Sequence, residues 1–133
     1  AGFVPPIAGI PIGVIVAIVC YYSIVLMKTK LKFDDSLDVF AVHGVGGIWG
    51  ALATGIFASS AISGTPGLLE GNTPQMLTQF IGVVAVAAFA FAATWVLGKL
   101  VDVTVGLRVG QVDETVGLDL SQHGERAYGG LLR

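Results

Sequence analysis

The chain contains three long apolar runs, at residues 7–27, 39–58 and 77–98. Short segments with lysine, aspartate, glycine and proline separate them. At about 1.5 Å per helical residue, each run reaches about 30 Å, the thickness of the hydrocarbon core of a bilayer. The pattern predicts an all-α membrane protein with three transmembrane helices, followed by a polar C-terminal segment.

Composition supports the lipid bilayer as the surroundings of this chain. Its 133 residues are 54% hydrophobic and 12% charged, and the mean hydropathy is +0.83. A net charge of −2 without a basic cluster excludes nucleic-acid binding. The single cysteine, Cys20, has no partner for an internal disulfide and is expected to be a small core residue. Because the sequence starts at Ala1 and not at a methionine, we expect a piece of a longer protein.

The charges between the runs predict how the helices are oriented. Three lysines follow the first run, which places that short connection in the cytoplasm by the positive-inside rule. Residues 59–75 carry glycines, prolines and one acid, as expected for an external loop. Residues 1–105 then form the membrane region of a multi-pass protein of the cell membrane, and residues 106–133 form a cytoplasmic tail. The three lysines are Lys28, Lys30 and Lys32.

Two groups of residues predict helix starts. Asp35 is a candidate cap for the second helix, with Asp38 three positions later in the place of a capping-box acid. Thr73 and Pro74 form an N-cap and first-turn pair before the third helix. A second interpretation of Asp34, Asp35 and Asp38 is a cation-attracting mouth at the cytoplasmic end of the second helix.

The second run contains one histidine, His43, and several glycines. A helical projection at about 100° per residue places them on one face, and branched apolar side chains on the other. Small residues permit close helix packing, so we expect His43 to face protein or a cavity and not lipid. The residues on its face are Val39, Gly46, Gly47, Gly50, Thr54 and Phe57, and those opposite are Ile48, Leu52 and Ile56.

Two interpretations of His43 follow from the residues alone. A neutral imidazole could join two helices through a hydrogen bond. Alternatively, ionisable side chains inside a membrane are costly and often mark a substrate or proton path, which favours function. An imidazole can donate at one ring nitrogen, accept at the other and titrate near neutral pH.

Enzymatic and metal chemistry find no support in the sequence. No cysteine and histidine cluster has the spacing of metal ligands, and no Ser/His/Asp set can be assembled. We therefore predict no enzyme activity, no cofactor and no metal site.

Two motifs resemble those of one known family, the ammonium transporters of the Amt/Mep type. The first is similar to the family's signature near the C-terminal end, and the second to its cytoplasmic C-terminal region. The first motif is Asp34-Asp35, then Asp38-Val39-Phe40-Ala41-Val42-His43-Gly44-Val45-Gly46-Gly47-Ile48-Trp49-Gly50 and Thr54-Gly55-Ile56-Phe57-Ala58. The second is Asp102-Val103-Thr104-Val105-Gly106-Leu107-Arg108-Val109, with Glu114, Gly117-Leu118-Asp119 and His123-Gly124-Glu125-Arg126-Ala127-Tyr128.

The resemblance implies that the chain is the C-terminal third of an eleven-helix fold with two inverted repeats, assembled as a homotrimer. It implies that His43 is one of a pair of pore histidines and that Val39 lines the lower pore. Ammonium would be recruited outside, give up a proton and cross as ammonia. The partner histidine, the external aromatic site and the phenylalanine gate of the family belong to earlier helices that this sequence does not contain.

For the tail, the resemblance implies contacts between subunits and with a PII-type signalling protein. The residues expected to take part are Arg108, Glu114, Gly117, Asp119, His123, Gly124, Glu125 and Tyr128. His123 also fits an exposed polar residue without a role. Two other functions stay open at this point, namely an ammonium sensor that signals through its tail and a structural membrane subunit.

Overall fold

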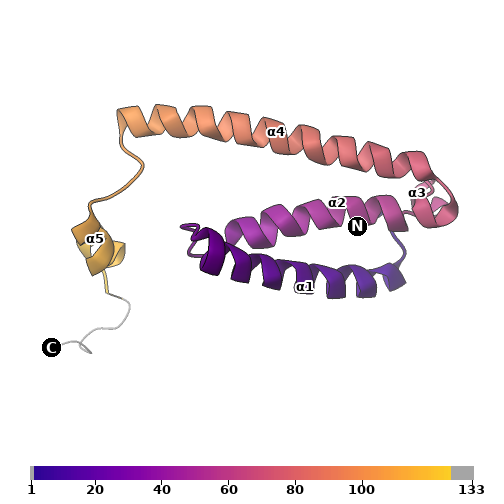
Figure 1. Ribbon diagram of the computed structural model, residues 1–133, viewed down its shortest axis with the longest axis horizontal. Coiled ribbons are helices and arrows are strands. Elements are labelled where there is room, and N and C mark those ends of the chain that lie inside the picture. Colours follow the sequence, from indigo (N-terminus) through magenta and orange to yellow (C-terminus); the bar gives the residue numbers. More distant parts are fainter. Residues whose placement is uncertain (1, 127–133) are drawn as a thin grey trace. The chain divides into compact units, whose positions relative to one another are not determined.

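The computed structural model describes residues 2–126, which are helical or irregular and contain no strand. The chain divides into two units, Ala1–Ala88 and Phe89–Arg133. Figure 1 shows the helices in chain order. They are η1 (Pro6–Ala8), α1 (Gly9–Leu26), η2 (Met27–Leu31), η3 (Phe40–Val45), α2 (Gly46–Phe57), α3 (Ser60–Ser63), η4 (Leu68–Glu70), α4 (Thr73–Thr104), α5 (Gln111–Val116) and α6 (Leu118–Ser121).

Three helical segments are long and apolar enough to cross a membrane, as the sequence predicts. They span Pro6–Leu31, Phe40–Phe57 and Thr73–Thr104. Each of the first two contains a π-helical turn, η2 at the end of the first segment and η3 at the start of the second. The fold class is therefore all-α with three candidate membrane spans.

The first and third segments are longer than predicted. The first continues through Lys28 and Lys30 to Leu31, and the next residue, Lys32, has a left-handed backbone with φ 51°. The third begins at Thr73 instead of Leu77 and continues past Lys99 to Thr104. Charged residues end an apolar run without ending a helix, so hydropathy alone underestimates these lengths.

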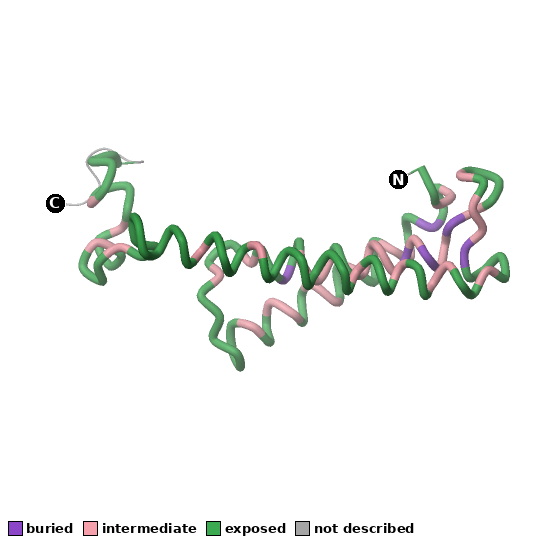
Figure 2. The backbone as a smooth tube through the Cα atoms, turned by 90° about the horizontal axis from the view of Figure 1, so that it is seen from above, coloured by how far each residue is buried: buried purple, intermediate pink, exposed green. Residues whose placement is uncertain are grey.

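In the first unit, α1 and α2 lie side by side (Figure 1), and the few buried residues are small. Figure 2 shows most of the buried positions near one end of this pair. Alanine and glycine permit backbones to approach closely, which is how helices pack in lipid. The buried residues are Ala8, Ala41, Ala53, Gly55, Ala58 and Gly67.

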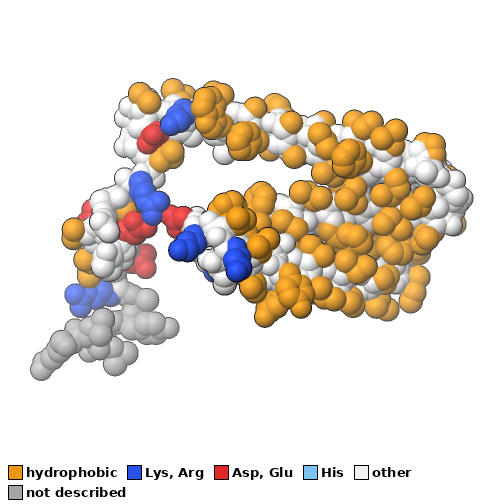
Figure 3. All heavy atoms as spheres, viewed as in Figure 1, with side chains coloured by type: hydrophobic (Ala, Val, Ile, Leu, Met, Phe, Trp, Pro, Cys, Tyr) orange, Lys and Arg blue, Asp and Glu red, His pale blue; other side chains and the backbone are white. Residues whose placement is uncertain are grey.

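Large apolar side chains are mostly exposed on the described chain. In Figure 3 they cover the visible face of α1 and α2, whereas lysine side chains gather where α1 has ended. An apolar surface of this extent suits lipid or further protein, and not water. The described chain thus has the surface of a membrane protein.

Residues 59–75 are more ordered than the predicted loop. The Ser59 amide donates to the Phe3 carbonyl at 2.9 Å, and the Gly67 amide donates to the Ala58 carbonyl at 2.8 Å. The Glu70 carboxylate accepts a 2.8 Å hydrogen bond from the Ser60 amide. Because these bonds return the loop to the ends of the helices, α3 and η4 form a cap on the first unit.

Candidate functional site

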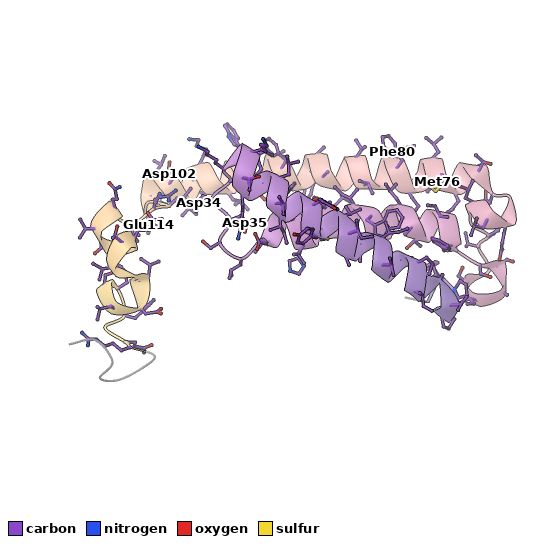
Figure 4. All side chains as sticks on the ribbon, turned by 60° about the horizontal axis from the view of Figure 1, so that its bottom comes forward. Asp34, Asp35, Met76, Phe80, Asp102 and Glu114 are labelled. Atoms are coloured by element: carbon purple, nitrogen blue, oxygen red, sulfur yellow. The ribbon has the colours of Figure 1, made fainter. Side chains whose placement is uncertain are left out.

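The helix that carries His43 begins at a carboxylate cap. Both Asp35 oxygens accept 2.9 Å hydrogen bonds, one from the Val39 amide and one from the Phe40 amide. These amides have no partner within the helix, so the carboxylate satisfies two of the free donors at its start. Hydrogen bonds from Phe40 and then Val39 lower the pKa of the Asp35 carboxyl below its ordinary value. The structure thus places Asp35 as a cap (Figure 4).

Asp38 differs from the capping-box acid that the sequence suggests. Its carboxylate pairs with Lys28 Nζ at 2.9 Å, and its backbone is left-handed with φ 57°. This ion pair joins the end of the first helical segment to the start of the second. Asp34 lies on the same connection and is exposed (Figure 4).

His43 lies within the π-helical turn η3, inside the second apolar segment. Its side chain is exposed and makes no hydrogen bond with any described residue. Val39, four positions earlier, is 50% exposed. Among the described residues, His43 therefore forms no hydrogen bond that joins two helices, as one of the two interpretations would require.

The face of α2 that packs on α1 starts three residues after His43. A Cβ on Gly46 would lie 3.2 Å from Cys20 Sγ and 3.4 Å from Val16 Cγ2, so the backbones approach closely there. Trp49 Nε1 donates a 3.1 Å hydrogen bond to the Ile12 carbonyl. Cys20 is half-buried in this contact.

The predicted glycine strip divides into packed and open positions. Gly46 contacts α1, whereas a Cβ on Gly47 or Gly50 would meet no described atom within 4 Å. Thr54 Oγ1 donates to the Gly50 carbonyl at 2.9 Å, inside α2. The π-helical turn changes the helical phase between His43 and Gly46, so the projection at a constant 100° per residue does not hold across it.

Gly55 is a packing position that the sequence analysis did not single out. A Cβ there would lie 2.9 Å from Gln79 Cγ and 3.0 Å from Met76 Sδ, so α2 meets the first turns of α4 at this glycine. Figure 4 labels Met76 on that part of α4. The sequence signal for Gly55 was its place in the motif that resembles the ammonium transporters, although Gly55 does not lie on the helical face of His43.

The tail residues lie in and around two short helices. Arg108 Nη2 pairs with Glu114 Oε1 of α5 at 2.9 Å, and Gly117 separates α5 from α6 with φ 97°. The Asp119 carbonyl accepts a 2.8 Å hydrogen bond from the Glu125 amide, which turns the chain back toward α6. His123 is exposed, and Gly124 has φ 68°. Tyr128 lies outside the described residues.

The acids, histidines and the cysteine are dispersed. Within residues 2–126, no three His, Cys, Asp or Glu side chains come close enough to hold a metal ion. A hollow of about 450 Å³ lies at the opposite end of the second segment from His43. It is lined mainly by apolar side chains of η1, the start of α1, the end of α2 and η4.

Comparison with known proteins agrees with the membrane fold. The model of the Ammonium Transporter Family matches residues 1–128. The chain is 48% identical over 128 residues to ammonium transporter Amt1 of Archaeoglobus fulgidus, covering 96% of this chain and 32% of that protein. It is 42% identical over 130 residues to an ammonium transporter of Bacillus subtilis, with the same two coverages of 96% and 32%. Ammonium transporter 1 of Dictyostelium discoideum is 44% identical over 130 residues, covering 96% of this chain and 28% of that protein.

The chain therefore spans about a third of the length of the curated relatives that it matches. The match extends through all three apolar segments and into the tail. This chain belongs to the ammonium transporter family.

Proposed function

We propose that this chain supplies part of a pathway through which ammonium or ammonia crosses a cell membrane. The observation that carries the proposal is His43, the one ionisable side chain of the span Phe40–Phe57, which is exposed on the described chain. An ionisable group at membrane depth is costly unless it faces a partner or a pathway. The relatives named ammonium transporter supply the substrate class.

The pathway residues of this chain are His43 and Val39. Val39 is half-exposed one turn before the imidazole and offers an apolar wall. Such a wall disfavours an ammonium ion, because a charge loses its hydration there, but it admits neutral ammonia. The imidazole can accept a proton at one nitrogen and donate at the other, which suits a substrate that changes its protonation state.

The open part of α2 is where other helices of a complete transporter would pack. Gly47 and Gly50 have room for a neighbouring backbone, and Thr54 has its hydroxyl bonded within the helix. Together with Gly46 they are the packing positions of this proposal. Asp34, Asp35 and Asp38 mark the cytoplasmic end of this helix, with Asp35 as its cap. A homotrimer with one such pathway in each subunit is the assembly we propose.

The tail is proposed as the regulatory segment on the cytoplasmic side, with a PII-type protein as its partner. The lysines after α1 support that side by the positive-inside rule. The Arg108–Glu114 ion pair gives the tail a local structure for such contacts. Truncation after Val109 in a full-length protein tests this: a transporter retains flux and loses regulation, whereas a sensor loses its output.

The test of the pathway is His43→Ala in a full-length protein that contains this chain. We expect uptake of methylammonium to be lost or strongly altered, while size-exclusion chromatography shows an unchanged oligomer. Ile48→Ala on the same helix is the matched control and should retain uptake. Unchanged uptake in His43→Ala would contradict the proposed role.

A further inference from the structure

No hydrogen bond within the described chain fixes the orientation of the His43 imidazole. The imidazole is exposed and has no hydrogen-bond partner among residues 2–126. Its direction therefore depends on the backbone of its own turn, η3. What holds that backbone then also determines where the imidazole points.

The turn is held at both of its ends. Before it, the Asp35 carboxylate binds the amides of Val39 and Phe40 at 2.9 Å. After it, Gly46 lies against Val16 and Cys20 of α1. Between these two points the backbone has a π-helical turn, a rare geometry that is frequent at functional sites.

Inside the turn, the Phe40 ring lies over Gly44. A Cβ on Gly44 would be 3.1 Å from Cδ2, 3.2 Å from Cε2 and 3.5 Å from Cγ of that ring. A Cβ at position 44 would therefore require the ring or the turn to move by a few tenths of an ångström. Gly44 directly follows His43, so a shift of its backbone also moves the imidazole.

We propose that Phe40 and Gly44 are positioning residues for His43, and that the ring packed on the glycine sets the turn from which the imidazole projects. The contact lies within one turn and needs no residue from elsewhere in the chain. Its effect on transport rests on the proposed function of His43, whereas its effect on the place of the imidazole does not.

The test uses Gly44→Ala, Phe40→Leu and the double variant in a full-length protein that contains this chain. In Gly44→Ala we expect cryo-electron microscopy to show a displaced imidazole. Methylammonium uptake should fall about threefold with a changed pH profile, since misplacement of a reacting group by about 1 Å can cost about a hundredfold and a shift of a few tenths of an ångström costs correspondingly less. Phe40→Leu removes the ring from the same contact, so it should also displace the imidazole, and the double variant should change position and uptake no more than the larger of the two single variants.

Gly82→Ala in α4 is the control, because a Cβ there meets no described atom within 4 Å. An imidazole that keeps its place in Gly44→Ala, or effects of the two single variants that add up in the double variant, would overturn the positioning role. If Gly44→Ala does not assemble, Phe40→Leu alone decides, since an unchanged imidazole and pH profile would also refute the proposal. Normal uptake in His43→Ala would instead refute the transport role and leave the structural readout valid.

Discussion

The indole Nε1 of Trp49 donates a hydrogen bond of 3.1 Å to the backbone carbonyl of Ile12, which joins α2 to α1. Gly46, one turn earlier on α2, meets Val16 and Cys20, which lie one and two turns after Ile12. The two contacts run in opposite directions along the helices, as an antiparallel pair requires. They fix the register of α1 against α2.

Replacing Trp49 by phenylalanine removes this hydrogen bond and retains an aromatic ring. Hydrogen bonds between membrane helices contribute about 0.6 kcal/mol on average and at most about 1.7 kcal/mol. We therefore expect Trp49→Phe to lower the thermal midpoint of the purified protein by a few degrees. Trp95→Phe is the matched control, because Trp95 of α4 is 60% exposed. Equal midpoints for the two variants would contradict a role of this bond.

Gly67 is expected to tolerate no side chain. A Cβ there would lie 2.8 Å from the amide nitrogen and the carbonyl oxygen of Ala58, and 2.8 Å from the Ile56 carbonyl oxygen. Backbone atoms cannot rotate away as side chains do. Gly67→Ala should therefore destabilise the fold of residues 59–75 by about 1–3 kcal/mol, the usual cost of overpacking. A thermal melt measures this. Gly13→Ala, where a Cβ meets no described atom within 4 Å, should not lower the midpoint, since alanine also favours the helix more than glycine does.

Much of the fold could be predicted from the lengths of the apolar runs. Such runs determine how many helices can span a bilayer, and the three observed segments coincide with those runs. They do not determine where a helix ends in water, so the extension of α4 through Lys99 to Thr104 was missed. The bonds that shape residues 59–75, such as Ser59 to Phe3, join distant parts of the chain and leave no local pattern.

The candidate site shows the same division. The place of His43 within a span follows from sequence, and so does the cap at Asp35. The π-helical turn does not, and neither does the close approach of Gly46 to Val16 and Cys20, because that contact joins residues distant in the chain. The pairing of Asp38 with Lys28 likewise requires the two helical segments to be close in space.

The Asp35 cap predicts a dependence of stability on pH. Its pKa is lower in the folded protein than in the unfolded chain, so its stabilising contribution is complete above the unfolded value. That contribution is lost as the pH falls through the folded value. We expect Asp35→Asn to lower the thermal midpoint at pH 7, and the difference from the wild type to shrink as the pH falls below about 4.

Asp102→Asn is the control for this experiment. Asp102 is exposed on α4 and makes no hydrogen bond with any described side chain or amide through its carboxylate. The thermal midpoint of the Asp102→Asn variant should equal that of the wild type at every pH. A gap between Asp35→Asn and the wild type that is constant with pH would show that the charge of the cap does not matter.

The Glu70 carboxylate predicts a similar pH dependence for the stability of residues 59–75. The Ser60 amide, then the hydroxyls of Ser59 and Ser60, lower the pKa of the Glu70 carboxyl. As with any carboxylate whose folded pKa is depressed, the stabilisation is present above the unfolded pKa and is lost as the pH falls through the folded one.

Hydrogen exchange should therefore show the Ser60 amide protected at neutral pH, and less protected in Glu70→Gln. Protection factors corrected for intrinsic exchange should converge for the two proteins in acid. Glu125→Gln in the tail is the control and should leave the protection of the Ser60 amide as it is in the wild type. An equal loss of protection in both variants would mean that the Glu70 hydrogen bond does not stabilise residues 59–75.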